Sequence, residues 1–386
     1  MRSPTSHHIS STQVHQWALS WLSEGLQLKD HGWKCTAMVV LSIVLCAAAR
    51  MSSIHAACRD LCHAPSDQAV FNALGDGLPK TLKVLEKRLH QALTDNLPTR
   101  LLRQAWTIAI DWHLVPYYGQ PKKSRNELYY GKPTRGTSKF HAYATACIVV
   151  RGVRHTIALT WVRRHESTVT ALHRLLAQIR EKGLKIKRLL LDRAFFNVPV
   201  TAFLQQENLP FLMPVVFRGR PPRKGKPVTG LRWIKRQKVG WQPHTLKSGK
   251  QQVSLSVCVA YRTHKHRKDG KRKQQKLLFG GWKVKGSPQE IRRMYRHRFG
   301  IESSYRQWRQ AMIYTCTREP HLRLLFVAVG LLLRNVWVWI HDRFLSEGTN
   351  EDRELHLEKL RFRRMLDWIA ITVVALLHDD SIPCVE

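Results

Sequence analysis

The spacing of apolar residues changes twice along this chain of 386 residues. Up to residue 103 apolar side chains recur at intervals of three and four, which is the period of amphipathic helices. Strand-like apolar runs then alternate with helical segments, and the helical period returns over 316–386. The helices expected in the two flanking regions span 12–27, 34–52, 67–75, 79–94, 98–104, 320–345 and 351–378. The pattern predicts an α/β part between two helical regions.

The α/β part begins with three strands and continues as helix, strand, helix, strand. Its expected strands span 105–111, 140–150, 154–162, 186–192 and 210–217. Its expected helices span 167–182, which Ser167 or Thr168 can cap, and 198–207. The loop 112–139 interleaves basic residues with tyrosines. Such a loop is either one wall of a groove for a polyanion or an ordinary long connection.

Three further strands are expected within residues 218–285. They fall in the segments LRWIKRQKVGWQ, QQVSLSVCVAYR and QKLLFGGWKV. The segment RGRPPRKGKP leads into them, and its prolines favour an extended linker. The polar segment THKHRKDGKRKQ contains an Asp-Gly pair, which is typical of a hairpin turn. We expect these residues to form a small β insertion in the α/β part.

The charge of the chain is extreme and unevenly distributed. Its formal net charge is +37, with a pI near 10.5, which indicates a polyanionic partner. Nucleic acid is the first candidate and an anionic membrane surface is the second. Residues 218–285 contain 21 Lys and Arg but only one acid, whereas residues 1–100 carry a net charge of about +3. This concentration predicts that the insertion faces DNA.

Two aspartates stand where buried strands are expected to end. Asp111 follows the apolar run AWTIAI, and Asp192 follows LKIKRLLL. The chain has only 27 acids against 64 Lys and Arg, so two acids at the expected ends of buried strands indicate a functional role. Alternatively, each aspartate only caps its strand or the following helix.

The segment 287–309 is expected to be a single helix. Ser287 and Glu290 can form a capping box around Pro288, which suits the first helical position. Four side chains then fall within one stripe about 60° wide, at 100° per residue: Tyr295, Arg298, Glu302 and Arg309. A stripe with one carboxylate, two arginines and a tyrosine suits a surface that holds a metal ion and grips phosphates. With the two aspartates it would supply three carboxylates, which can bind a pair of Mg²⁺ ions.

These residues resemble the DDE transposases of bacterial insertion sequences. The likeness is to the group with a Tyr-x2-Arg-x3-Glu-x6-Lys signature, which reads here Tyr295, Arg298, Glu302 and Arg309, with Arg in place of Lys. The segment LLLDRAFF resembles the family's second block, in which Asp192 is followed by Arg193 and an aromatic residue. The first block departs from the family, because His113 stands where a small hydroxyl residue is frequent. The likeness covers about residues 105–315.

The resemblance implies an α/β fold with a ribonuclease H-like mixed sheet. The catalytic core would consist of 104–217 and 286–315, with the β insertion 218–285 before the last catalytic helix. The helical N-terminal domain, 1–103, would bind DNA ends or serve in packing and dimerisation. The C-terminal helical region, 316–386, would pack against the core or a second protomer. The first and fourth strands of this fold are neighbours, so Asp111 and Asp192 would lie side by side.

The resemblance also implies the chemistry. Asp111, Asp192 and Glu302 would hold two Mg²⁺ ions, with Mn²⁺ as an alternative, while the protein nicks the ends of a mobile element and joins the 3′-OH to target DNA. The residues expected to contact DNA are Tyr295, Arg298, Arg309 and Arg193 near the cut, Trp233, Trp241 and Trp282 in the insertion, and Lys271, Arg272 and Lys273 at its hairpin tip. The three tryptophans could instead form the core of the insertion.

The expected partners are the double-stranded DNA of the element ends and of the target, bound by a homodimer. We expect a cytoplasmic protein at the nucleoid, without a signal peptide, and no membrane partner. The apolar segment 35–49 is short for a membrane span, and Arg334 interrupts the second one, 324–340. Two alternatives remain open: a DNA-binding protein without catalytic activity, and a metal-dependent nuclease without strand transfer.

Overall fold

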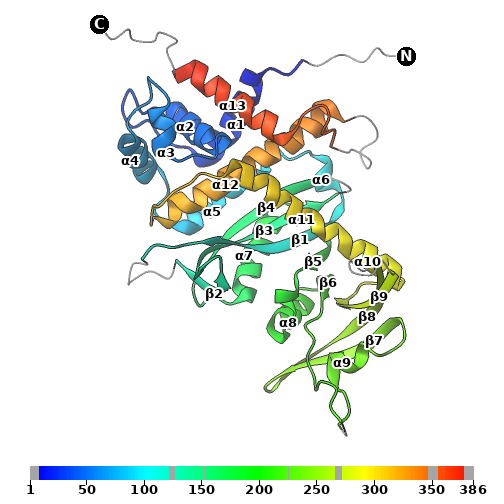
Figure 1. Ribbon diagram of the computed structural model, residues 1–386. Helices are drawn as coiled ribbons and strands as arrows, with labels where there is room; N and C mark the ends of the chain where they lie inside the picture. Colours follow the sequence, from blue (N-terminus) through cyan, green and yellow to red (C-terminus); the bar gives the residue numbers. More distant parts are fainter. Residues whose placement is uncertain are drawn as a thin grey trace, which may run out of the picture.

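A computed structural model describes residues 8–120, 127–150, 153–224, 226–265, 272–346 and 355–377. Figure 1 shows the helices of the two chain ends gathered at one end of the molecule, with the sheet below them. The insertion lies at the opposite end, far from the helices α1 and α13. The two regions that the apolar pattern predicts to be helical therefore lie together in space, apart from the strands of the insertion.

The described strands form one nine-stranded sheet, in the order β2-β3-β1-β5-β6-β9-β8-β7, with β4 also paired to β3. Their bounds are β1 Ala105–Pro116, β2 Tyr129–Thr134, β3 Thr137–Val149, β4 Arg154–Val162, β5 Lys185–Leu191, β6 Phe211–Pro214, β7 Gly240–Ser248, β8 Gln251–Lys265 and β9 Arg272–Trp282. β3 is antiparallel to β1 and β4, whereas β1, β5 and β6 are parallel. The ribonuclease H-like fold expected from the sequence is confirmed.

Helices cover both faces of this sheet. On one face α10 (Pro288–Arg296) and α11 (Gly300–Trp308) pack against inward residues of the parallel strands. The core on that face consists of Ala109, Cys147, Leu190, Leu212, Cys258, Ala260, Phe279, Ile291, Tyr295 and Tyr305. Neighbouring strand residues such as Ile110 and Leu191 belong to the main core on the other side, with α7 (Thr168–Glu181) and α8 (Val198–Gln206). The alternation of side chains along β1 and β5 produces these two cores.

The N-terminal and C-terminal helices pack together in one helical region. Its members are α1 Ser11–Leu26, α2 Ala37–Ala49, α3 Ile54–Arg59, α4 Asp67–Gly77, α5 Leu82–Thr94, α6 Arg100–Arg103, α12 Pro320–Ile340 and α13 Phe362–Leu377. Trp17 and Trp21 of α1 contact the ring of Trp339 in α12 edge to face. Residues Pro320–Leu345 are long and apolar enough to cross a membrane, but 94% of their most apolar window is buried inside the protein. Such burial is what a core helix requires.

β4 is an outer strand of the sheet, yet side chains seal its free edge. Asn335 of α12 accepts from the Thr156 amide at 2.9 Å and donates to the Thr156 carbonyl at 2.7 Å. Gln178 of α7 makes the same pair of bonds to Leu159, at 3.1 Å each. These bonds satisfy backbone groups that an edge strand leaves unpaired.

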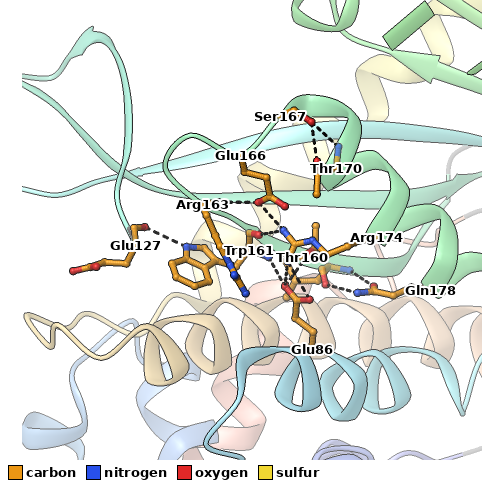
Figure 2. Close-up of polar contacts among 11 residues, drawn as sticks. Glu86, Glu127, Thr160, Trp161, Arg163, Glu166, Ser167, Thr170, Arg174 and Gln178 are labelled. Carbon is orange, nitrogen blue, oxygen red and sulfur yellow. Dashed lines mark hydrogen bonds and ion pairs between the residues drawn. The ribbon is translucent and has the colours of Figure 1, made fainter. Parts of the chain in front are cut away.

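The last part of this edge is held by a buried ionic network (Figure 2). Glu86 of α5 accepts from the Trp161 amide at 2.8 Å and from the Thr160 hydroxyl at 2.7 Å. Arg174 lies between the carboxylates of Glu86 and Glu166, at 3.3 and 2.8 Å. Burial raises the pKa of Glu86, although the charge of Arg174 acts in the opposite direction. The N-terminal helices are thus joined to the sheet by buried polar contacts.

The structure corrects three expected elements. The start of LRWIKRQKVGWQ is a short helix, α9 (Gly230–Ile234), because Leu231 and Ile234 bury one helical face. β2 lies inside the expected loop 112–139; its mostly exposed sequence YYGKPT lacks apolar alternation and suits an outer strand. The last helix begins at Phe362, because side chains of α12 and the turn after it bind the Leu360 carbonyl. The described residues 355–361 form turns instead.

Candidate active site

The two aspartates of the expected acid cluster lie on neighbouring parallel strands. Ile110 of β1 is in register with Leu191 of β5, so Asp111 and Asp192 are the next residues on both strands. The sequence predicted Asp111 at the end of its strand, and this prediction is wrong. The strand β1 continues past Asp111 to Pro116, paired with β3. The pairing with β5 ends just before Asp111, and the sheet opens at that point. The acids therefore stand where two parallel strands separate.

One guanidinium group contacts both carboxylates. Nη2 of Arg298 lies 3.0 Å from Oδ2 of Asp111 and 4.0 Å from Oδ1 of Asp192. The other oxygen of Asp111 accepts from the Trp112 amide at 2.9 Å. Asp192 occupies the cap position of the 3₁₀ turn Arg193–Phe195, but its side chain accepts no capping hydrogen bond there. The capping explanation therefore fails for Asp192, whose side chain remains 44% exposed.

The segment that carries Arg298 is not one continuous helix. The capping box is confirmed, with the Ser287 amide donating to Oε2 of Glu290 at 2.7 Å, and these bonds lower the pKa of Glu290. However, α10 ends at Arg296, and a 3₁₀ turn, His297–Phe299, separates it from α11. The expectation of a single stripe over 287–309 is wrong, because the tighter turn changes the helical phase. Gly300, a weak helix former, starts the second helix.

Two buried tyrosines hold the backbone at the two acid positions. The Tyr295 hydroxyl donates to the carbonyl of Leu191 at 3.1 Å, directly before Asp192. The Tyr305 hydroxyl lies 2.6 Å from Oγ1 of Thr145 and 3.4 Å from the carbonyl of Asp111. Burial, together with the charge of Asp111, raises the pKa of Tyr305 well above its usual value. The sequence analysis did not single out Tyr305. Its position seven residues after Arg298, which is two helical turns, was the signal that could have placed both on one helix face.

The other two residues of the signature lie on α11 and just after it. Glu302 is in the first turn of α11, and its side chain lies outside the described residues. Arg309 is exposed in the 3₁₀ turn Arg309–Ala311. Burial, with a smaller effect of the Arg309 charge, lowers the pKa of His113 to about 3. His113 stands two residues beyond Asp111 and is a neutral, buried neighbour of the acid pair at physiological pH.

The donor set at this position fits a hard divalent cation. Two carboxylates from adjacent strands face a cationic group, and carboxylate oxygens are the ligands that Mg²⁺ prefers. Among the described side chains, no group of three or more His, Cys, Asp or Glu is close enough to hold a metal ion. Glu302 is the third acid that the sequence predicts, and its side chain lies outside the residues covered by that description.

A basic cleft of about 730 Å³ opens beside the acids, between α10 and the insertion. Its cationic lining residues are Arg193, Lys235, Arg262, Lys276, Arg292 and Arg296. No carboxylate lines the described part of this cleft, and the ring of Phe217 forms part of the wall. Arg193, one of the lining residues, follows Asp192 directly in the chain, so one part of the cleft lies next to this acid. A positive groove with an aromatic wall suits a nucleic-acid strand.

The expected DNA contacts of the insertion are spread over different environments. Trp233 is 50% exposed on α9. Trp241 donates to the Gly286 carbonyl at 2.9 Å, and both Trp241 and Trp282 are partly buried against the cores. Arg272 is exposed at the start of β9; the side chain of Lys273 and the whole of Lys271 lie outside the described residues. None of these tryptophans lines the cleft.

Comparison with known proteins assigns the catalytic region. Residues 103–328 match the family model described as the transposase DDE domain, and this is more than half of the chain. The chain belongs to the DDE transposase domain family. The transposase domain reaches from the end of α6 into α12 and contains the acid pair, the insertion and Glu302. None of the curated proteins compared with the chain matches it.

A solved transposase has the same fold. The cryo-EM structure of the piggyBac transposase synaptic complex with hairpin DNA aligns over 99% of this chain and 84% of its own, with a TM-score of 0.51. The identity is 12%, so this likeness shows the fold alone. Because the alignment covers 99% of the present chain, it includes the helices at both of its ends and the insertion.

Proposed function

We propose that the chain is a cut-and-paste DNA transposase of a bacterial insertion sequence, of the group with the Tyr-x2-Arg-x3-Glu-x6-Lys signature. It nicks the ends of its element and joins the resulting 3′-OH to target DNA. The observation that carries this proposal is the acid pair, Asp111 and Asp192, which adjacent parallel strands bring to a single guanidinium group. The match of residues 103–328 to the transposase DDE domain supports the same reaction class.

In this proposal Asp111, Asp192 and Glu302 hold two Mg²⁺ ions, for which Mn²⁺ can substitute. The ions supply activation of the attacking oxygen and stabilisation of the leaving 3′ oxygen. The protein contributes the placement: the hydroxyls of Tyr295 and Tyr305 bind the backbone carbonyls at the two aspartate positions. Because both tyrosines are buried, these positions are fixed before DNA arrives.

The proposed DNA path follows positive charge away from the acids. The phosphates of one strand would lie along the cleft between α10 and the insertion, with Arg193 at its inner end. Arg309, exposed in the turn after α11, would hold the strand near the cut. The related piggyBac complex contains hairpin DNA, which supports double-stranded element ends as the partner. Excision at two ends requires at least a homodimer on DNA, acting in the cytoplasm at the nucleoid.

The test is cleavage of DNA that carries the flanking ends of the gene, with Mg²⁺ or Mn²⁺. We expect metal-dependent nicking by the wild type, loss of nicking in Glu302→Gln and Asp192→Asn, and joined products when target DNA is present. Glu290→Gln is the matched control, because a glutamine at this position of the same segment preserves the capping box. This control should cut as the wild type does.

Three other outcomes would redirect the proposal. Equal DNA binding without cutting by any variant would leave a DNA-binding protein without catalytic activity. Cutting without joined products would indicate a nuclease. Full cutting by Glu302→Gln would remove Glu302 from the set of metal ligands.

A further inference from the structure

A buried arginine outside the acid pair contacts the break between α10 and α11. Arg154, the first residue of β4, is 6% exposed and has no acidic partner within the described part of the chain. Its guanidinium donates to three backbone carbonyls instead: Nη1 to Val150 and, at 2.7 Å, to Val153, and Nη2 to His297 at 2.5 Å. A buried cation paired only with carbonyl groups is costly unless its contacts are well made.

The contact with His297 falls where the helix is interrupted. In a continuous α-helix the His297 carbonyl would accept from the amide four residues later. Here this carbonyl accepts from the Gly300 amide, three residues later, and from the guanidinium of Arg154, and the chain tightens into the 3₁₀ turn His297–Phe299. A Cβ atom at Gly300 would lie 2.5 Å from Cζ of Arg154, so a larger residue there would displace the guanidinium from its present position.

α12 fixes Arg154 from the other side. Nη1 of Arg334, a buried residue of α12, donates to the carbonyl of Arg154 at 2.6 Å. Nε of the same arginine donates to Oε1 of Gln307 in α11 at 3.1 Å. The start of β4 is therefore tied both to the long core helix and to the helix that carries Glu302.

We propose that Arg154, together with Gly300, is a positioning residue of the active site. It stabilises the turn in which the next residue, Arg298, reaches Asp111, and it fixes the start of α11, two residues before Glu302. Through these two positions Arg154 sets the affinity of the acid cluster for metal without contacting the metal itself. The effect on metal rests on the proposed function; the effect on the turn does not.

The test uses the full chain and the variants Arg154→Leu, Arg154→Lys, Gly300→Ala and the double variant Arg154→Leu/Gly300→Ala. Mn²⁺ affinity is measured by electron paramagnetic resonance, and hydrogen exchange is followed over residues 297–304. We expect Arg154→Leu and Gly300→Ala each to weaken Mn²⁺ binding about 10-fold, the effect typical of outer-shell partners. Exchange over 297–304 should accelerate, while exchange in β1 and β5 stays unchanged.

Two comparisons separate positioning from a general loss of structure. Arg154→Lys keeps the charge but not the planar fork, and should recover part of the Mn²⁺ affinity lost in Arg154→Leu. The double variant should bind Mn²⁺ no more weakly than Arg154→Leu alone, since both changes remove one contact. Arg164→Leu, an exposed arginine just beyond the other end of β4, is the control and should alter neither measurement.

The outcomes distinguish this proposal from the proposed function. If the wild type binds no Mn²⁺ and cuts no DNA, the proposed function fails, while faster exchange over 297–304 would still support the role of Arg154 in the turn. If the wild type binds Mn²⁺ and the variants match it in affinity and exchange, the positioning role is wrong. Should Arg154→Leu fail to fold, Arg154→Lys and Gly300→Ala decide the question.

Discussion

At the scale of single residues, two tyrosine hydroxyls determine where the aspartates stand. Tyr295 binds the carbonyl of Leu191 and Tyr305 binds the carbonyl of Asp111, so each hydroxyl fixes backbone at an acid position. Both tyrosines are buried, at 5% and 8% exposure. Tyr295 also lines the basic cleft, but its hydroxyl is bound to the Leu191 carbonyl, and a buried hydroxyl with a backbone partner contributes stability and order. Tyr295 was expected from the sequence to contact DNA, and its burial suggests a test of that expectation.

We predict that Tyr295→Phe lowers the free energy of unfolding by about 1 kcal/mol, because the Leu191 carbonyl loses its hydroxyl partner. Binding of short duplex DNA without metal should stay within about twofold of the wild type, since a buried hydroxyl makes little contribution to this equilibrium. Urea denaturation measures the first quantity and fluorescence anisotropy the second. Tyr314→Phe, at a side chain that is 53% exposed, is the control. A large loss of DNA affinity in Tyr295→Phe, but not in Tyr314→Phe, would show that the Tyr295 hydroxyl contributes to DNA binding.

The sequence predicted that the two aspartates lie side by side, as they do, but it did not predict the contacts around them, for one physical reason. Asp111 and Asp192 each follow an apolar run, so the pattern of burial alone marks them. The orientation of Arg298 depends on the turn at His297, which depends in turn on a guanidinium from another strand. Tyr305 acts through a contact with Thr145, 160 positions away along the chain. Long-range contacts of this kind leave no periodic signal in the sequence.

At the scale of elements, the buried outer strand β4 shows how the helical region and the sheet are joined. Every residue of β4 is buried, although on one side it has no neighbouring strand among the described residues. Side chains from α5 and α7 (Figure 2), together with Asn335 of α12, take the place of that strand. A buried backbone group without a partner costs about 1–3 kcal/mol, so this substitution is a condition for burying the edge.

We predict that Asn335→Leu lowers the free energy of unfolding by about 3 kcal/mol, measured by urea denaturation. The leucine fills similar space but leaves the amide and carbonyl of Thr156 and the carbonyl of Leu93 without their side-chain partner. Asn72→Leu, at an exposed position of helix α4, is the matched control and should change stability by less than about 0.5 kcal/mol. Similar losses in the two variants would mean that the amide bonds to β4 contribute little.

The elements themselves were largely predictable, and the errors share a cause. β4 spans Arg154–Val162, as expected, because its apolar run is continuous between polar ends. The break at His297–Phe299 was missed because capping signals describe where a helix starts, not what binds a carbonyl in its middle. The short helix α9 was read as a strand because five residues contain too few positions to distinguish the two periods.

At the scale of the whole molecule, charge is the property that acts on DNA at a distance. The insertion lies at the far end of the molecule from the helical region, so its charge of +20 is well separated from the nearly neutral N-terminal helices (Figure 1). A concentrated field of this kind raises association rates and makes binding depend on salt. The expected contacts at the hairpin tip, Lys271, Arg272 and Lys273, belong to this field.

We predict that changing Lys271, Arg272 and Lys273 together to glutamine weakens DNA binding and reduces its dependence on salt. If each residue meets one phosphate, the slope of log K against log[salt] becomes shallower by about 2.7. The control changes Lys29, Lys80 and Lys83, which are exposed in the helical region, so the net charge falls equally. Titration by fluorescence anisotropy at several salt concentrations gives both slopes. Equal effects of the two triple variants would show that only net charge matters.

The buried histidines should make the stability of the whole molecule depend on pH. His141 in β3 and His155 in β4 are 2% and 1% exposed. Burial, followed by the charges of nearby arginines, lowers the pKa of each to about 3. In the unfolded chain a histidine takes up its proton near pH 6.5, so the unfolded state binds more protons between pH 6.5 and 3. Stability is therefore complete above pH 6.5 and is lost as the pH falls through this window.

We predict that each of these histidines contributes a slope of about 1.4 kcal/mol per pH unit within that window. His155→Phe removes one titrating group and keeps an aromatic ring of similar size in the core. The free energy of unfolding of this variant should therefore fall less steeply than that of the wild type, by about that slope, when urea denaturation is repeated between pH 7.5 and 4.5. The other titrating groups are common to both proteins, so their contributions cancel in the difference. Parallel curves would show that His155 takes up its proton at the same pH in the folded and the unfolded chain.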